Sequence, residues 1–285
     1  MKHSVSPVVT STWLAEHIND DTLRVVDASW HMPAAKRDAQ SEYAKGHIPG
    51  AVFFDIDKHS APSELPHMLP EAEQFAAAAG ALGISDQHVI VVYDTLGIFS
   101  AARVWWMFRH FGAAQVYVLD GGLPAWQDGG HELVVGESVV SSTTFTVRST
   151  EEQRMMQVLS AQRVLNLSDV PNALIVDARA HARFTGEQKE PRAGLRSGHI
   201  PGSVSLPFTR LLKDDGTLLN VGALKLIFED LGVKETTRIV TTCGSGVTAA
   251  VICLALESAG YERVALYDGS WSEWGASEQL PVATC

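Results

Sequence analysis

Cysteine is scarce in this chain. Among its 285 residues there are three cysteines, Cys243, Cys253 and Cys285. An odd and sparse set does not build the disulfide framework of a small secreted domain, and it suits free thiols in a reducing compartment. We therefore expect a cytoplasmic protein, and the chain is long enough to bury a core without disulfides.

Long apolar runs and an excess of positive charge are also absent. The longest apolar run, residues 247–256, is far too short to span a membrane, and residues 1–14 have neither an apolar signal-peptide core nor an Arg-rich amphipathic pattern. The formal net charge is −11 at pH 7, which disfavours nucleic acid or an anionic membrane as a partner. We expect neither kind of partner.

Four phrases occur twice in the same order with nearly equal spacings. They pair "LRVVDAS" with "ALIVDAR", "GHIPGAVFF" with "GHIPGSVSL", "HVIVVYD" with "TRIVTTC", and "QVYVLDGGLPAW" with "RVALYDGSWSEW". Such repetition indicates an internal duplication of one domain. Residues 134–153 are polar and lack helical periodicity, although "TTFTV" could pair as an edge strand. We expect an N-terminal domain at 1–137, a linker at 138–153 and a C-terminal domain at 154–285.

Within each half, short apolar β-branched runs alternate with helical stretches. This alternation predicts two tandem α/β domains, each a mostly parallel sheet covered by helices on both faces. In such sheets the reactive groups lie just past the carboxyl ends of strands. Asp94, after "VIVVY", and Cys243, after "RIVTT", occupy matching places there.

The stretch "CGSGVTAA", which begins at Cys243, joins an expected strand to an expected helix. Glycines allow positive φ, so loop N–H groups can point inward, and the helix beginning near Val247 adds its positive end. A thiolate in such a cradle is stabilised without a basic neighbour. We therefore interpret Cys243 as a nucleophile, Cys253 as a core residue and Cys285 as an exposed terminal thiol.

The duplicated "DA", "GHIPG" and "DG-x3-W" phrases, together with the "CGSGVTA" loop, resemble the two-domain rhodanese superfamily, and the loop resembles that of its 3-mercaptopyruvate sulfurtransferases. The resemblance covers nearly the whole chain. It implies sulfur transfer from 3-mercaptopyruvate to a thiol or cyanide through a persulfide on Cys243, with release of pyruvate. It also implies an N-terminal copy without a nucleophile, since Asp94 stands at the cysteine position.

The resemblance further implies a catalytic relay of Ser245, His67 and Asp57, which would polarise the thiol or pass a proton to the leaving carbon. The alternative for His67 in "PHMLP" is a loop histidine packed beside two prolines. The loop backbone is expected to hold the developing negative charge on the substrate. The loop residues expected to contact substrate are Gly244, Gly246, Val247 and Thr248.

Four arginines lie between the strand "ALIVDAR" and the second "GHIPG" phrase. The resemblance implies that Arg183 in "ARF" and Arg192 in "EPRAG" clamp the substrate carboxylate, which arginine matches in bidentate geometry. Arg179 directly follows the strand, so we expect it to brace the loop. We expect Arg196 to be a surface residue.

Three other functions are compatible with a cysteine in such a loop or with this fold. Thiosulfate sulfurtransferase is the alternative: its enzymes place basic residues inside the loop to meet a dianion, whereas "CGSGVT" has none and favours a monoanionic donor. A dual-specificity phosphatase needs a longer loop ending in Arg, where Thr248, Ala249 and Ala250 stand here. A non-catalytic binding module would have no need of Cys243 and its glycines.

No cofactor is expected, because the sequence has no Cys/His cluster with metal-ligand spacing and no phosphate-binding glycine motif. The resemblance implies small-molecule partners, namely 3-mercaptopyruvate as the donor and cyanide or small thiols as acceptors, with thioredoxin as a protein acceptor. We expect the chain to act as a monomer.

Overall fold

The computed structural model describes residues 6–148, 156–167, 170–262 and 264–285, and it divides into two compact units. The first unit draws on Met1–Ala61, Pro70–Gln153 and Leu212–Leu218, and the second on Pro62–Leu69, Arg154–Leu211 and Leu219–Cys285. Each unit therefore includes one short segment from the other half of the chain. We name residues 62–69 the first arm and residues 212–218 the second arm.

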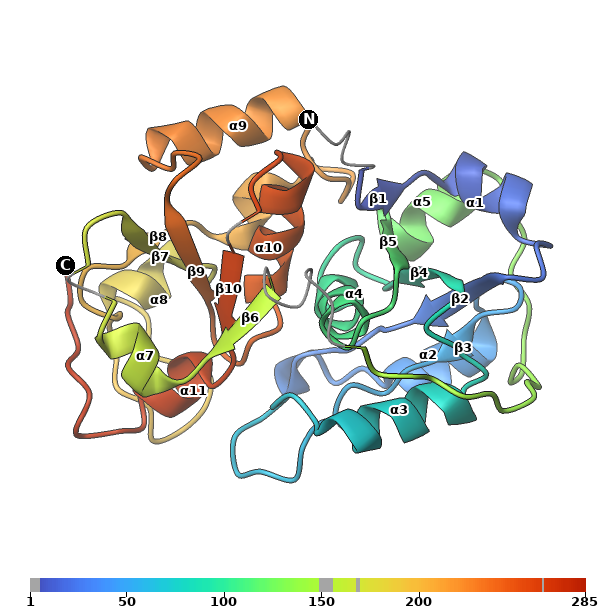
Figure 1. Ribbon diagram of the computed structural model, residues 1–285, viewed down its shortest axis with the longest axis horizontal. Coiled ribbons are helices and arrows are strands. Elements are labelled where there is room, and N and C mark those ends of the chain that lie inside the picture. The colour runs from blue at the N-terminus through green and yellow to red at the C-terminus, as the bar shows by residue number, and fades with distance from the viewer. Residues whose placement is uncertain (1–5, 149–155, 168–169, 263) are drawn as a thin grey trace. The chain divides into compact units, whose positions relative to one another are not determined.

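The first unit contains a five-stranded parallel sheet with the strand order β1–β5–β4–β2–β3 (Figure 1). The central strands are β-branched and apolar, as expected for strands covered on both faces. The strands are β1 (Val8–Val9), β2 (Leu23–Asp27), β3 (Val52–Phe53), β4 (Val89–Tyr93) and β5 (Gln115–Leu119).

Helices cover both faces of this sheet. On one face, Leu14 of α1 and Tyr43 of α2 pack with Trp126 of α5 in a single core cluster. On the other face α4 packs on β4 and β5, and Phe108 of α4 contacts Phe75 of α3. The helices are α1 (Ser11–His17), α2 (Ala39–Lys45), α3 (Ala72–Ala81), α4 (Ala101–His110) and α5 (Gly122–Asp128), with a short 3-10 turn η1 (Pro33–Ala35).

The described part of the expected linker contacts the first unit without forming a strand at "TTFTV", so the suggested edge strand is wrong. Phe145 is buried and meets Phe75 edge-on. The N–H group of Thr143 donates to the carbonyl oxygen of Gly80 at 2.9 Å. A Cβ on Gly80 would lie 2.5 Å from the oxygen of Thr143, so only glycine permits this approach. Residues 149–153 of the expected linker lie outside the described residues.

The second unit repeats the same topology. Its strand order is β6–β10–β9–β7–β8, again with every pair parallel. This repetition confirms the prediction of two tandem α/β domains with parallel sheets. The strands are β6 (Met156–Leu159), β7 (Ala173–Asp177), β8 (Val204–Ser205), β9 (Arg238–Thr242) and β10 (Val264–Tyr267).

Helices also lie on both faces of the second sheet (Figure 1). On one face, Val164 of α7 packs in a core cluster with Trp271 and Trp274 of α11. On the other face α10 packs against β9, β10 and α9, and it is apolar all round because it is buried on every side, Cys253 included. The helices are α7 (Ala161–Leu165), α8 (His181–Thr185), α9 (Val221–Asp230), α10 (Ala249–Ser258) and α11 (Ser270–Trp274), with the 3-10 turn η2 (Phe208–Leu211).

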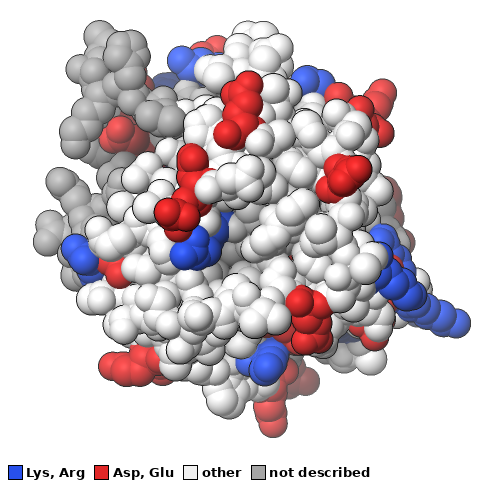
Figure 2. Space-filling model, turned by 90° about the vertical axis from the view of Figure 1, so that its right-hand side faces the viewer, with Lys and Arg blue, Asp and Glu red and all other residues white. Residues whose placement is uncertain are grey.

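Charged side chains of both signs are scattered over the face drawn in Figure 2, among uncharged side chains. Within the described residues, no helix has the length and apolar character that crossing a bilayer requires. Of the two other thiols, Cys253 is buried in α10 and Cys285 is exposed, as the sequence predicted.

Candidate active site

Cys243 is the first residue after β9, at the carboxyl edge of the second sheet. The chain turns there through residues 243–248 before α10 begins at Ala249. Gly246 adopts φ +77, a left-handed conformation that favours glycine and lets so short a turn close. The Cys243 side chain is largely enclosed, because the residue is only 2% exposed.

Ser270, at the start of α11, holds the loop from behind. Its Oγ accepts hydrogen bonds from the N–H groups of Cys243 at 3.2 Å and Gly246 at 3.1 Å. The same hydroxyl donates to the carbonyl oxygen of Tyr267 at 2.8 Å. Ser270 is fully buried and has φ +50, a conformation rare outside glycine. The Gly246 N–H, expected to face substrate, is therefore directed at Ser270 instead.

The next residues of α11 hold the carbonyl side of the loop. The N–H group of Trp271 donates to the oxygen of Cys243 at 2.9 Å. Ser272 donates twice to the oxygen of Gly244, through its N–H at 2.9 Å and its hydroxyl at 2.6 Å. Because these bonds fix the peptide planes, they also fix the direction in which the remaining loop N–H groups point.

The N–H groups of Gly244, Ser245 and Val247 have no acceptor among the residues that the structure describes. They are the part of the expected anion cradle that stays available to a ligand. Thr248 is the N-cap residue of α10, so the positive end of that helix adds to the same place.

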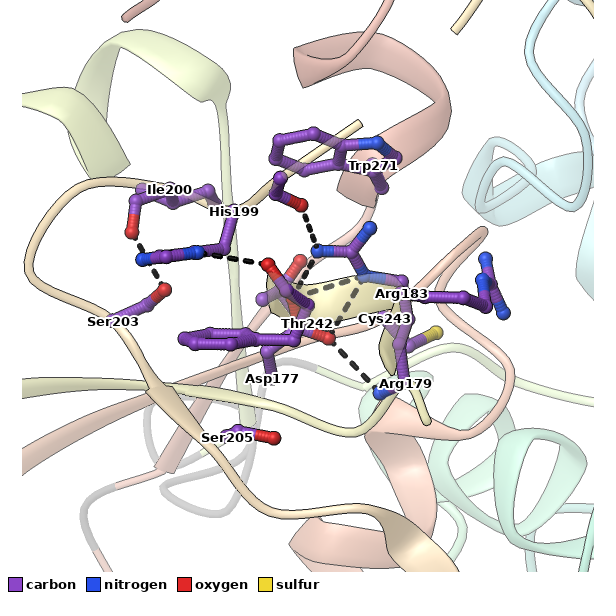
Figure 3. Close-up of polar contacts among 12 residues, drawn as sticks. Asp177, Arg179, Arg183, His199, Ile200, Ser203, Ser205, Thr242, Cys243 and Trp271 are labelled. Carbon is purple, nitrogen blue, oxygen red and sulfur yellow. Dashed lines mark hydrogen bonds and ion pairs between the residues drawn. The ribbon is translucent and has the colours of Figure 1, made fainter. Parts of the chain in front are cut away.

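Two arginines from α8 and the segment after it also lie beside the cysteine loop. A Cβ built on Gly244 would lie 3.4 Å from Nη2 of Arg183 and 3.8 Å from Nη1 of Arg192. Arg183 belongs to α8, and Arg192 to the segment that follows it. Figure 3 shows the Arg183 side chain next to the sulfur of Cys243. The structure thus brings both arginines singled out in the sequence to the residue that follows Cys243.

Glu190, which the sequence analysis missed, ties Arg183 to Arg179. Its carboxylate accepts from Nε of Arg183 at 3.2 Å and from Nη1 of Arg179 at 2.8 Å, and its side chain is only 1% exposed. A buried carboxylate between two guanidinium groups restricts both arginines to one orientation. The sequence signal was present in the "EPR" triplet, where an acid precedes the expected substrate arginine by two residues.

Arg179 braces the carboxyl ends of the strands, as expected. It pairs with Asp177 at the end of β7, donates to the carbonyl oxygen of Gly198, and lies 4.2 Å from the ring centroid of Trp271 (Figure 3). Burial alone would lower the pKa of Arg179, but the charges of Asp177 and Glu190 outweigh it and raise that pKa. The guanidinium therefore stays charged and cannot act as a proton donor at neutral pH.

Arg196 is not the free surface residue that the sequence suggested. Its guanidinium donates to the carbonyl oxygens of Trp274 at 2.8 Å and Gly275 at 3.1 Å, and also to that of Ser277. Carbonyl groups at the end of a helix such as α11 have no donor within the helix, and a nearby cation can supply one.

The first arm brings His67 to the loop. Its Nδ1 and the Ser245 Oγ form a hydrogen bond of 2.9 Å between two buried residues. Asp57, the third expected member of the relay, is an exposed residue of the first unit that accepts a hydrogen bond from Trp30 Nε1 at 2.9 Å. Two members of the relay are therefore in contact, and the role of Asp57 stays a prediction.

The N-terminal copy fills its own loop with a carboxylate. Asp94 accepts hydrogen bonds from the N–H groups of Leu96, Phe99 and Ala101, each at 2.8 Å. Complete burial raises the pKa of Asp94, and these three bonds partly oppose the rise. Gly122 stands here where the second copy has Ser270, and a Cβ on it would lie 2.3 Å from the backbone carbonyl oxygen of Asp94. The two copies thus satisfy their loop amides in different ways.

No group of three or more His, Cys, Asp or Glu side chains within the described ranges could hold a metal ion. The chemical groups gathered at this edge of the second unit are a thiol, a Ser–His pair, two guanidinium groups and unpaired loop amides. Such a set can form a covalent bond to sulfur and hold a small anion beside it.

Known proteins show the same organisation. The family model described as "Rhodanese-like domain" matches residues 10–129 and 160–277. The 3-mercaptopyruvate sulfurtransferase of Escherichia coli (strain K12) is 45% identical over 278 residues, covering 96% of this chain and 96% of that protein. Thiosulfate/3-mercaptopyruvate sulfurtransferase 1, mitochondrial, of Arabidopsis thaliana is 42% identical, covering 97% of this chain and 78% of that protein. The crystal structure of an Escherichia coli 3-mercaptopyruvate sulfotransferase superposes with a TM-score of 0.84 at 42% identity, covering 94% of this chain and 99% of that one.

Proposed function

Since this chain belongs to the rhodanese family and carries two rhodanese-like domains, we propose that it is a sulfurtransferase that moves sulfur from 3-mercaptopyruvate to a thiol or cyanide and releases pyruvate. The membership confirms the resemblance seen in the sequence. The observation that carries the proposed site is the position of Cys243 at the carboxyl end of β9, with Arg183 and Arg192 both beside Gly244.

The first half of the reaction loads the enzyme with sulfur. Arg183 and Arg192 bind the carboxylate of 3-mercaptopyruvate, and the Cys243 thiolate attacks its sulfur, forming an S–S bond. The C–S bond breaks, and its electron pair leaves with the carbon as the enolate of pyruvate. The arginines and the free N–H groups of Gly244 and Ser245 stabilise the negative charge that develops.

The pair of Ser245 and His67 supplies the proton chemistry. The imidazole of His67 is hydrogen-bonded to the hydroxyl of Ser245, which belongs to the loop. A proton can therefore pass from His67 through Ser245 to the enolate carbon, which gives pyruvate. Asp57 completes the relay by favouring the protonated imidazole. The proposal for Asp57 rests on the family resemblance, and that for His67 and Ser245 rests also on their contact.

The second half of the reaction unloads the sulfur. Cys243 now carries a persulfide, and we place its outer sulfur beside the N–H groups of Gly244, Ser245 and Val247, which have no acceptor among the described residues. The positive end of α10 favours the negative charge of that sulfur. A thiol or cyanide attacks the outer sulfur and regenerates the Cys243 thiolate. Thioredoxin is the protein acceptor that we propose, and we propose that the chain works as a monomer.

Two-donor kinetics test this proposal. Pyruvate and thiocyanate are followed with cyanide as the acceptor, for wild type, Cys243→Ser and Cys253→Ser. Cys253 is the matched control, because it is a second buried thiol of the same unit. We expect Cys243→Ser to be inactive and Cys253→Ser to keep wild-type turnover. Equal activity of wild type and Cys243→Ser would contradict the proposed nucleophile.

Thiosulfate is the second candidate donor, because the Arabidopsis relative is named for both compounds. The loop itself carries no basic side chain, and its two neighbouring arginines match one carboxylate. We therefore expect kcat/KM to favour 3-mercaptopyruvate by orders of magnitude. A preference for thiosulfate in the same assay would overturn this assignment while leaving the nucleophile intact.

The cellular compartment is proposed on composition alone. Three cysteines that form no disulfide suit a reducing compartment, which supports the cytoplasm. The Arabidopsis relative is named as a mitochondrial protein, so the mitochondrion is the alternative location. Fractionation of the source cells, followed by detection of the chain, distinguishes the two locations.

A further inference from the structure

The aspartate of the repeated "DG" phrase holds an arm in each unit. In the second unit, Asp268 Oδ2 accepts a hydrogen bond of 2.7 Å from the N–H group of Leu69 in the first arm. In the first unit, Asp120 Oδ1 accepts one of 2.7 Å from the N–H group of Leu218 in the second arm. The duplication has therefore kept the same contact twice, once near Cys243 and once near Asp94.

In the second unit this contact lies between two parts of the candidate active site. Asp268 precedes Ser270 by two residues, and Ser270 holds the N–H groups of Cys243 and Gly246. Leu69 follows His67 by two residues, and His67 contacts Ser245. One turn, residues 268–270, thus fixes both the cysteine loop and the arm that brings the histidine to it.

The backbone of the first arm has an unfavourable conformation at His67. Its φ is +60, a left-handed conformation that is uncommon outside glycine and that costs a histidine free energy unless surrounding contacts hold it. The bond from Leu69 to the buried Asp268 carboxylate is a contact that can impose it, because it anchors the arm two residues away. Without that anchor the arm can relax to ordinary φ values, which moves the imidazole from Ser245.

We propose that Asp268 is a positioning residue for the sulfur transfer: through the N–H group of Leu69 it holds the first arm so that His67 meets Ser245. The inference rests on the proposed function, since it gives the anchor a role in the same proton transfer. The role that we assign to Asp268 is to bind the arm through its Oδ2. Asp120 has the same chemical contact in the copy without a nucleophile, so its role is structural only.

The experiment compares Asp268→Ala with Asp120→Ala, which removes the same type of bond from the other unit. Thermal unfolding and sulfur transfer from 3-mercaptopyruvate are measured for both. We expect similar losses of thermal stability, but a fall in kcat of about tenfold or more for Asp268→Ala only, in line with the loss of a positioned proton donor. KM is expected to stay within about twofold, since Arg183 and Arg192 are untouched. Asp268→Asn, which retains an acceptor oxygen, is expected to recover most of the activity.

A double-mutant cycle with His67→Ala separates positioning from general damage. If Asp268 acts through His67, adding Asp268→Ala to His67→Ala lowers kcat by less than about twofold. Multiplicative losses, or equal losses of kcat for Asp120→Ala and Asp268→Ala, overturn the proposal. If Asp268→Ala does not fold, Asp268→Ser replaces it in the cycle, because its short side chain keeps a hydroxyl in the turn and does not reach Leu69.

A readout that needs no donor keeps this inference separate from the proposed function. The rate at which iodoacetamide alkylates Cys243 is measured across pH, with the modified peptide identified by mass spectrometry because Cys285 is exposed. Wild type that transfers no sulfur from either donor refutes the proposed function. In that case, equal changes of the alkylation profile in His67→Ala, Asp268→Ala and the double variant still support the positioning role. An unchanged profile in Asp268→Ala refutes it.

Discussion

Ser270→Ala tests whether one hydroxyl organises the cysteine loop. The Ser270 Oγ accepts the N–H groups of Cys243 at 3.2 Å and Gly246 at 3.1 Å, and all three residues are largely or fully enclosed. Alanine removes the acceptor without filling its place. Both N–H groups are then left in a buried site without a partner.

The expected magnitude follows from those two bonds. A buried donor left without a partner costs about 1–3 kcal/mol, and two donors that shared one acceptor should together cost about 2–4 kcal/mol. The φ of +50 at this position adds a second expectation. Ser270→Gly loses the same acceptor but relieves the left-handed strain, so it should be about 1 kcal/mol more stable than Ser270→Ala.

The assay combines urea unfolding with sulfur transfer at a temperature where every variant is folded. Displacing the loop by about 1 Å is enough to lower turnover by about 100-fold, and we expect a loss of that order for Ser270→Ala and Ser270→Gly. Ser272→Ala is the matched control, because the Gly244 carbonyl that loses its hydroxyl donor still accepts from the Ser272 N–H. Its stability should fall by about 1 kcal/mol and its turnover by no more than a few fold.

The reasoning is refuted if Ser270→Ala unfolds like wild type, since the two amides would then have found other partners at no cost. It is also refuted if Ser270→Ala and Ser272→Ala lose the same activity. Ser270→Gly below Ser270→Ala in stability would contradict the strain at φ +50 specifically.

Three further predictions concern the arginine pair, the linker and the first unit. Arg192→Ala should raise KM for 3-mercaptopyruvate about 10–100-fold, as expected for a lost charge-assisted hydrogen bond, with a smaller change in kcat; an unchanged KM in steady-state assays would remove Arg192 from the substrate site. Phe145→Ala should destabilise the protein to urea by about 3–5 kcal/mol, because Phe145 is 4% exposed and packs on Phe75; a loss below about 1 kcal/mol would show that the linker contact is dispensable. Asp94→Asn should leave sulfur transfer unchanged. Burial raises the Asp94 pKa above 3.8, so the folded protein binds this proton more tightly than the unfolded chain does. The stability of wild type relative to this variant should therefore fall as pH rises from 3.8 through the raised pKa. Urea unfolding of both proteins across that range measures the slope, and the opposite sign would mean that the Asp94 pKa is lowered.

Much of the fold follows from local patterns. The continuous apolar run "VIVVY" predicted a strand buried on both faces, and β4 spans those residues. The repeated phrases predicted two copies of one domain, and the two sheets have the same strand order. A helix was also expected to begin near Val247, and α10 begins two residues later, at Ala249. Local signals suffice here because each copy repeats a short unit whose strands and helices alternate along the chain.

Part of the candidate site was equally readable. Cys243 follows a strand and precedes a helix, so its place at the carboxyl edge of the sheet depends only on the order of elements. The family motifs singled out Arg183 and Arg192, and the structure brings both to Gly244. Comparing "DGG" with "DGS" could also have identified Ser270 as a site residue, since glycine is replaced by serine in the copy that carries the cysteine.

The sequence by itself determined the elements, their order and the residue that follows each strand, because these depend on neighbours along the chain. Only the tertiary structure decided which groups satisfy the loop, since its partners come from elsewhere: Ser270 is 27 residues from Cys243, and His67 is 178 residues from Ser245. No local pattern records that the first arm belongs to the second unit. Burial supplies the reason, because an enclosed amide or hydroxyl must find a partner wherever the packed chain provides one.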